Sequence, residues 1–151
     1  MNEQSKMAIE ILIDSIYESK LDTKILKNAI QITLVSADEA NSDVTLKITG
    51  DEEMHQLNRT YRNIDRTTDV LSFNQNYIDP ETGRFYLGDI IIAFDHAQAQ
   101  AEANQRPLIE ECTRLAIHGT LHLLGYDHAE PGEKEIMWEK QENLLDNAME
   151  S

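Results

Sequence analysis

Residues 107–125 read PLIEECTRLAIHGTLHLLG and form the most strongly patterned segment of the chain. Pro107 suits the first turn of a helix, where its missing N–H is harmless. Gly125 suits the point where a helix ends, because glycine readily adopts a positive φ. Leucines occupy apolar positions between them at helical spacing: Leu108, Leu115, Leu121 and Leu124. We therefore predict a helix over residues 107–124 and place the other elements around it.

The flanking sequence alternates between the patterns of strands and helices. Four segments have the pattern of strands: residues 7–14, 43–50, 68–75 and 87–94. Four more have the period of helices: residues 20–40, 51–62, 95–104 and 132–147. Residues 77–86 contain Pro80 and Gly83, which indicates a loop or a hairpin turn. The pattern predicts an α+β (α/β-like) fold with a mixed sheet of about four strands, in which the apolar segment 87–94 is central, and about five helices.

The length and composition indicate one domain. A chain of 151 residues can bury about two-thirds of its unfolded surface in a single core, and no repeat or flexible linker interrupts it, so we predict one domain over residues 1–151. No apolar run approaches a membrane span and no secretory signal pattern is present, so we expect a cytoplasmic protein without a membrane partner. Cys112 is the only cysteine, which excludes a disulfide framework and indicates a small apolar residue on a helix.

The charge is strongly acidic but unevenly distributed. A net charge of -15 argues against broad, non-specific coating of nucleic acid, which requires a basic surface. The segment NRTYRNIDR, residues 58–66, nevertheless places Arg59, Arg62 and Arg66 against the single acid Asp65. Such a run is either a solvated helix end or a local site for an anionic backbone. We treat Arg62 as a candidate catalytic residue, with Arg59 and Arg66 as candidates for substrate binding.

Three of the five histidines lie within HGTLHLLGYDH, residues 118–128. On a helix, His118 and His122 share one face one turn apart, so their imidazoles can reach a single Zn²⁺. A turn at Gly125 would bring His128 to the same ion at the end of the helix. Three protein ligands leave a fourth coordination position open, which is typical of catalytic rather than structural zinc. The spacing therefore predicts one Zn²⁺ per chain, held by His118, His122 and His128.

The same spacing is the histidine frame of the metzincin zinc peptidases, but Gly119 replaces their catalytic glutamate. Without that base, protonation of a departing amine has no evident source, whereas zinc alone suits phosphodiester chemistry, with an arginine to stabilise the developing charge. Glycine also lowers helix propensity by about 1 kcal/mol relative to alanine, which suggests that a side chain at position 119 would obstruct something.

Three motifs together resemble the YbeY family of bacterial endoribonucleases: HGTLHLLGYDH, LNRTYRNIDRTTDVLSF (residues 57–73) and LGDIII (residues 87–92). The resemblance extends over nearly the whole chain and implies a single α/β domain. It also implies zinc held by His118, His122 and His128, and a functional arginine at Arg62. Processing of the 3′ end of 16S rRNA, ribosome quality control, and partnership with a small-subunit ribosomal protein or an assembly GTPase are further expectations from the family.

These observations predict a cleft between the histidine helix and the strand at residues 68–75. If that strand lies at a sheet edge, its backbone and the three arginines could hold single-stranded rRNA beside the zinc. Alternatively, Asp69, Ser72 and Phe73 only build the sheet. His55 and His96 are interpreted as structural or surface groups, and Met137 and Trp138 as core or partner-facing residues.

The main hypothesis is a zinc-dependent endoribonuclease acting on single-stranded rRNA. Two alternatives remain. One is a zinc peptidase with an unrecognised base. The other is a non-catalytic assembly factor, in which zinc stabilises the fold and the acidic surface binds a basic ribosomal protein.

Overall fold

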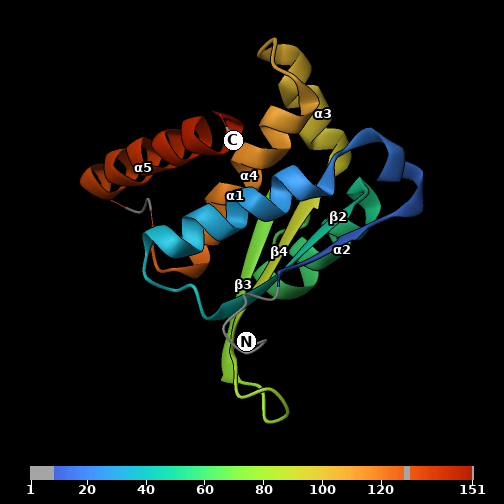
Figure 1. Cartoon of the computed structure of the whole chain (residues 1–151). Helices are drawn as coiled ribbons and strands as arrows, with labels where there is room; N and C mark the ends of the chain where they lie inside the picture. Colours follow the sequence, from blue (N-terminus) through green and yellow to red (C-terminus); the bar gives the residue numbers. More distant parts are fainter. Residues whose placement is uncertain (1–8, 128–129, 151) are drawn as a thin grey trace.

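The strands and α-helices follow one another along the chain in the predicted order (Figure 1). The computed structural model describes residues 9–127 and 130–150. The strands are β1 (Ile9–Ile13), β2 (Ser42–Thr49), β3 (Val70–Ile78) and β4 (Phe85–Ala93). The α-helices are α1 (Thr23–Ser36), α2 (Asp51–Arg62), α3 (Phe94–Ala103), α4 (Leu108–Leu123) and α5 (Pro131–Glu150), and a short 3-10 helix, η2 (Ser15–Lys20), precedes α1.

Two regions depart from the predicted boundaries. The segment predicted as one helix over residues 20–40 starts later, because the Asp22 side chain caps the backbone N–H of Lys24, and it ends before Asp38, which has a φ of 58°. The predicted loop at residues 77–86 is shorter, because β3 continues to Ile78 and β4 begins at Phe85. Cross-strand pairing therefore extends further into the hairpin than the local sequence pattern indicates.

The four strands form one mixed sheet in the order β1-β2-β4-β3. β1 and β2 are parallel, as are β2 and β4, whereas β3 pairs with β4 in the antiparallel direction. This confirms the predicted α+β class and single domain with a mixed sheet, and the interior position of β4. It also places β3 at a sheet edge, which was the condition for a binding role of its backbone. The edge position matters for function because it places one side of β3 beside the helix that carries the histidines.

Alternate residues of β4 face different helices. Ile90 and Ile92 contribute to the core shared with α1 and α4, whereas Ile91 and Ala93 pack with Met54 of α2. A further cluster joins α1, α4 and α5 through Ala29, Ile117, Leu121, Met137, Leu144, Leu145 and Ala148. The layers are therefore α2, the sheet, α1 with α4, and then α5 (Figure 1). In this arrangement α4 is covered on both sides, which fixes its position relative to β3.

None of the helices in the described part of the chain is both long and apolar enough to cross a membrane.

Candidate functional site

The contact between α4 and the sheet is close at Gly119. A Cβ atom at this position would lie 2.6 Å from Cγ2 of Ile90 and 3.0 Å from Oγ of Ser72. The Ser72 hydroxyl donates a hydrogen bond of 3.0 Å to the backbone carbonyl of Gly119. The prediction that a side chain at position 119 would obstruct something is therefore confirmed: it would crowd the side chains of Ile90 and Ser72 in the sheet. A glutamate at this position, as in a metzincin peptidase, would have to start from the same crowded Cβ.

Two further polar residues, Asn74 of β3 and Asp69 just before it, also have structural roles. The Asn74 side-chain amide donates a 2.8 Å hydrogen bond to the carbonyl of Leu123, the last residue of α4. This carbonyl has no partner within the helix, so Asn74 stabilises the helix end. Asp69 accepts hydrogen bonds from the Val70 backbone N–H at 2.8 Å and from the Gln100 side chain at 3.1 Å. Ser72 and Asn74 thus hold α4 against β3, and Asp69 stabilises the start of β3.

His118 and His122 point their Nε2 atoms towards each other, 3.1 Å apart. Two nitrogens that bind one tetrahedral zinc ion at the usual bond length are about 3.3 Å apart. The spacing of this pair therefore fits a shared divalent cation. The Nδ1 atom of His118 lies 2.7 Å from Oε1 of Gln141 on α5. The two ring nitrogens of His118 thus face different surroundings, one the neighbouring histidine and the other the C-terminal helix.

The third expected ligand, His128, lies outside the described residues. Within residues 9–127 and 130–150, no group of three His, Cys, Asp or Glu side chains is arranged to hold a metal ion. The described backbone does make the predicted turn: Gly125 has a φ of 102°, and the Tyr126 N–H bonds to the carbonyl of Leu121 at 3.0 Å. The chain leaves the helix at the expected place, and the ligand role of His128 remains a prediction.

The histidine pair opens into a polar cleft of about 560 Å³ at the edge of the sheet. Arg62, the last residue of α2, lines the same cleft from the opposite face of the sheet. Asn63 follows with a φ of 59°, so α2 ends immediately after this arginine. The remaining lining residues are Thr68, Asp69, Val70, Ser72, Asn74, Gly125, Tyr126 and Asp127. The structure thus brings Arg62, His118 and His122 together from segments far apart in the sequence.

Arg59 and Arg66 are exposed and, among the described residues, do not line this cleft. Arg59 lies in the last turn of α2, and the Arg66 carbonyl accepts a 2.9 Å hydrogen bond from the Asn58 side chain. Both side chains remain on the arginine-rich segment next to Arg62. If they bind substrate, as predicted, they would contact it beside the cleft and not inside it.

Three residues outside the cleft, His55, His96 and Cys112, have the structural surroundings that the sequence indicated. His55 pairs with Asp65 at 2.7 Å, and His96 pairs with Asp51 at 3.1 Å. Burial raises the pKa of Cys112 to about 12, so its thiol is inert near neutral pH.

Sequence reasoning missed Gln141, the α5 residue that contacts His118. A signal for it existed. Met137, Gln141, Leu144, Leu145 and Ala148 follow helical spacing, and all five are buried. Gln141 is the one amide in this otherwise apolar stripe of α5. A polar side chain at such a position indicates a buried hydrogen-bond partner on a neighbouring helix, although the sequence does not identify that partner.

The fold and the cleft together define a small α+β domain with a histidine pair and an arginine at a sheet edge. The family model described as "Endoribonuclease YbeY" matches residues 3–149. The chain therefore belongs to the YbeY endoribonuclease family, as the three sequence motifs indicated.

Relatives from several bacteria agree with this assignment. The chain is 34% identical to the Endoribonuclease YbeY of Roseiflexus castenholzii over 149 residues, covering 95% of this chain and 94% of that protein. It is 42% identical to the Endoribonuclease YbeY of Desulfitobacterium hafniense over 117 residues, covering 74% of each chain. The solution structure of TM1509 from Thermotoga maritima aligns with a TM-score of 0.62 and 27% identity, covering 93% of this chain and 88% of that one. The fold and the family are thus supported by independent comparisons.

Proposed function

We propose that this protein is a zinc-dependent endoribonuclease that cuts single-stranded rRNA during maturation of the 3′ end of 16S rRNA and in ribosome quality control. The observation that carries the proposal is the cleft in which Arg62, His118 and His122 meet. The family description supplies the endoribonuclease class. The rRNA substrate and the role in quality control are expectations from the resemblance in the sequence motifs.

His118 and His122 would hold the zinc ion, with His128 as the expected third ligand. When bound, zinc supplies a Lewis acid that neutralises charge on a phosphate and activates the attacking nucleophile. The spacing of the two Nε2 atoms, 3.1 Å, supports this role. Imidazole ligands also suit other first-row divalent ions, so metal analysis of the purified protein belongs with the activity assay.

Arg62 is proposed to bind the phosphodiester at the reacting phosphate. A guanidinium can donate two parallel hydrogen bonds to phosphate oxygens, and it strengthens these bonds as negative charge develops in the transition state. Its location at the rim of the same cleft as the histidines supports this role. Because β3 is an edge strand, its backbone is available to align an extended RNA strand along the cleft.

The absence of a side chain at Gly119 favours phosphodiester over peptide hydrolysis. A Cβ atom at this position would crowd the side chains of Ile90 and Ser72, and glycine itself cannot supply the general base of a metzincin peptidase. Breaking a peptide bond requires protonation of a poor leaving amine, which makes that missing carboxylate costly. We therefore retain the endoribonuclease and not the peptidase as the proposed activity.

We further propose that the protein acts on the small ribosomal subunit, through one of its proteins or an assembly GTPase. Its net charge of -15 favours a basic protein partner. The local cluster of Arg59, Arg62 and Arg66 would remain the contact for RNA.

A cleavage assay on a single-stranded rRNA fragment, with metal-loaded protein, tests the proposal. We expect the charge reversal Arg62→Glu to reduce cleavage by about 100- to 1000-fold. Lys27→Glu makes the same charge change on the exposed face of α1, and we expect it to cleave at the wild-type rate. Chelation should abolish cleavage, and return of zinc should restore it.

Equal activity of Arg62→Glu and Lys27→Glu would reject the proposed catalytic role of Arg62. Cleavage that persists after complete removal of metal would reject zinc dependence. A third outcome would favour the assembly factor with structural zinc. In that case neither wild type nor His118→Ala cleaves RNA above background, but only His118→Ala loses its association with the ribosome.

A further inference from the structure

His118 is in contact with a buried amide on α5. Its Nδ1 atom lies 2.7 Å from Oε1 of Gln141, and Gln141 is only 7% exposed. Neighbouring positions on the same face of α5 are apolar, including Met137 and Leu144. Burying an amide among apolar side chains is unfavourable unless its hydrogen bonds are satisfied. The amide therefore calls for an explanation beyond packing.

The orientation of this amide is fixed by its neighbour Glu142. The Gln141 Nε2 atom donates to Oε2 of Glu142 at 3.3 Å. An ionised carboxylate only accepts hydrogen bonds, so the amide must turn its NH₂ group towards Glu142 and its carbonyl oxygen towards His118.

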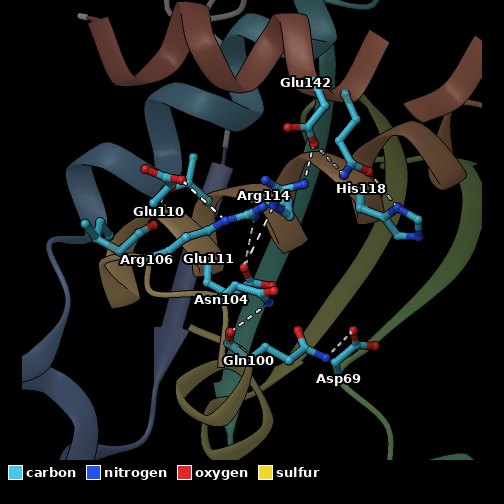
Figure 2. A network of polar contacts seen from close by, with 12 residues as sticks. Asp69, Gln100, Asn104, Arg106, Glu110, Glu111, Arg114, His118 and Glu142 are labelled. Atoms are coloured by element: carbon cyan, nitrogen blue, oxygen red, sulfur yellow. Dashed lines mark hydrogen bonds and ion pairs between the residues drawn. The ribbon is translucent and has the colours of Figure 1, made fainter. Parts of the chain in front are cut away.

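Glu142 in turn pairs with the guanidinium of Arg114 on α4, across the interface between the two helices (Figure 2). The Arg114 side chain is 15% exposed and lies 3.8 Å from the Glu111 carboxylate on its other side. The guanidinium thus lies between the carboxylates of Glu111 and Glu142. A continuous series of hydrogen bonds thus connects Arg114, through Glu142 and Gln141, to His118.

The donors and acceptors in this series determine which ring nitrogen of His118 carries the proton. Because Oε1 of Gln141 can only accept, the Nδ1 atom of His118 must be the donor. A neutral imidazole with its proton on Nδ1 presents a lone pair at Nε2. That Nε2 atom faces His122 at 3.1 Å, on the side that lines the cleft.

We propose that Gln141 is a positioning residue that fixes the tautomer and ring orientation of His118, so that Nε2 is ready to bind the metal ion. This inference rests on the proposed function, because it assumes that His118 is a ligand. Loss of a group that hydrogen-bonds a ligand histidine typically lowers metal affinity by about 10- to 100-fold. Gln141 itself would contact neither substrate nor metal. Its effect is to increase the fraction of His118 that carries its proton on Nδ1 and can therefore bind a metal ion through Nε2.

The tautomer is measured first, in the metal-free protein, from the ¹⁵N chemical shifts of the His118 ring. We expect wild type to carry the proton on Nδ1 and Gln141→Leu, which keeps the side chain's approximate size, to show a mixture of the two tautomers. Zinc affinity, measured by competition with a chromogenic chelator, should fall by about 10- to 100-fold in Gln141→Leu. At saturating zinc its cleavage rate should return close to that of wild type.

Two further variants separate hydrogen bonding from packing. Gln141→Glu retains an acceptor for the His118 Nδ1–H, and we expect it to recover the wild-type tautomer and most of the zinc affinity. Met137→Leu alters the same buried face one turn earlier on α5, and we expect it to leave both unchanged. A wild-type tautomer and affinity in Gln141→Leu would overturn the inference, as would an equal loss in Met137→Leu. Failure of wild type itself to bind any divalent ion would instead overturn the proposed function.

Discussion

The two halves of α4 hold polar side chains in different ways, although both contact α5: Arg114 in the first half pairs with Glu142, and His118 in the second half contacts Gln141 (Figure 2). In the first half, Glu111 and Arg114 are enclosed by ion pairs with each other, with Arg106 before the helix and with Glu142 on α5. In the second half, His118 and His122 direct ring nitrogens into the polar cleft beside β3. One helix therefore carries a closed polar cluster and an open one.

The difference shows how the burial of a polar group separates structure from function. Burial raises the pKa of Glu111, against the opposing effect of Arg114 and Arg106, so this carboxylate is held at a cost and has no access to a ligand. The histidines lie only one to three turns further along, yet they face a cleft that also contains Arg62. We infer that the closed half mainly contributes to stability and the open half to activity.

Removing a histidine from the open half should have the largest effect. We expect His118→Ala to lower RNA cleavage at least about a thousandfold, equivalent to about 4 kcal/mol, because an expected metal ligand is lost. Its free energy of unfolding without metal, measured in urea, should fall by only about 1 to 2 kcal/mol, because the buried Gln141 oxygen loses its hydrogen-bond donor. His55→Ala removes a histidine that pairs with Asp65 away from the cleft, and its cleavage rate should equal that of wild type. Equal rates for the two variants would refute the division between the halves.

Breaking the closed half should instead destabilise the fold. Arg114→Met removes the guanidinium between Glu111 and Glu142, whose side chains are 5% and 24% exposed. We expect the free energy of unfolding to fall by about 2 to 3 kcal/mol, because Glu111 keeps a buried charge with weaker compensation. Lys47→Met breaks an ion pair with Glu53 that is far more exposed, and should cost less than about 1 kcal/mol. If urea unfolding gives the same loss for both, burial does not distinguish the two pairs.

The sequence predicted the open half better than the closed one. Histidines four residues apart on an amphipathic helix, followed by a glycine, define a face and a turn from local spacing alone. The structure places them as expected, and Gly125 adopts the predicted positive φ. Arg62 was also predicted, but its approach to the histidines depends on where α2 ends relative to β3, which only the fold determines.

The closed half depends on contacts between residues far apart in the sequence. Arg114 and Glu142 belong to different helices, and nothing in the local pattern of either helix pairs them. The same reason explains why Gln141 was missed and why the hairpin strands extend beyond their predicted ends at residues 75 and 87. Helix faces, glycine turns and the order of elements are local properties, whereas cross-helix polar partners are properties of packing.

Gly119 lies in the open half of α4, between His118 and His122, and its substitution should have an intermediate effect. A Cβ atom there would come within 2.6 Å of Ile90 in the sheet. We expect Gly119→Ala to lower the free energy of unfolding by about 1 to 2 kcal/mol, since overpacking outweighs the gain in helix propensity of about 1 kcal/mol. The matched control is Gly132→Ala on α5, where an added Cβ atom would meet open space, and it should be neutral or slightly stabilising. A stabilising Gly119→Ala would contradict the proposed close contact between α4 and the sheet.

The smallest expected effect is a difference in pH dependence between two glutamates. Burial raises the pKa of Glu111, so its contribution to stability is greatest below the pKa of the unfolded chain and is lost as pH rises through the folded value. The hydrogen bond from Lys47 lowers the pKa of Glu53, so its contribution is present above the unfolded value and is lost as pH falls through the folded one. Between about pH 7 and about pH 4, the stability of wild type relative to Glu111→Gln should therefore rise, while its stability relative to Glu53→Gln should fall. Urea unfolding at the two pH values measures both differences. If both differences change in the same direction, burial does not outweigh the ion pairs of Glu111.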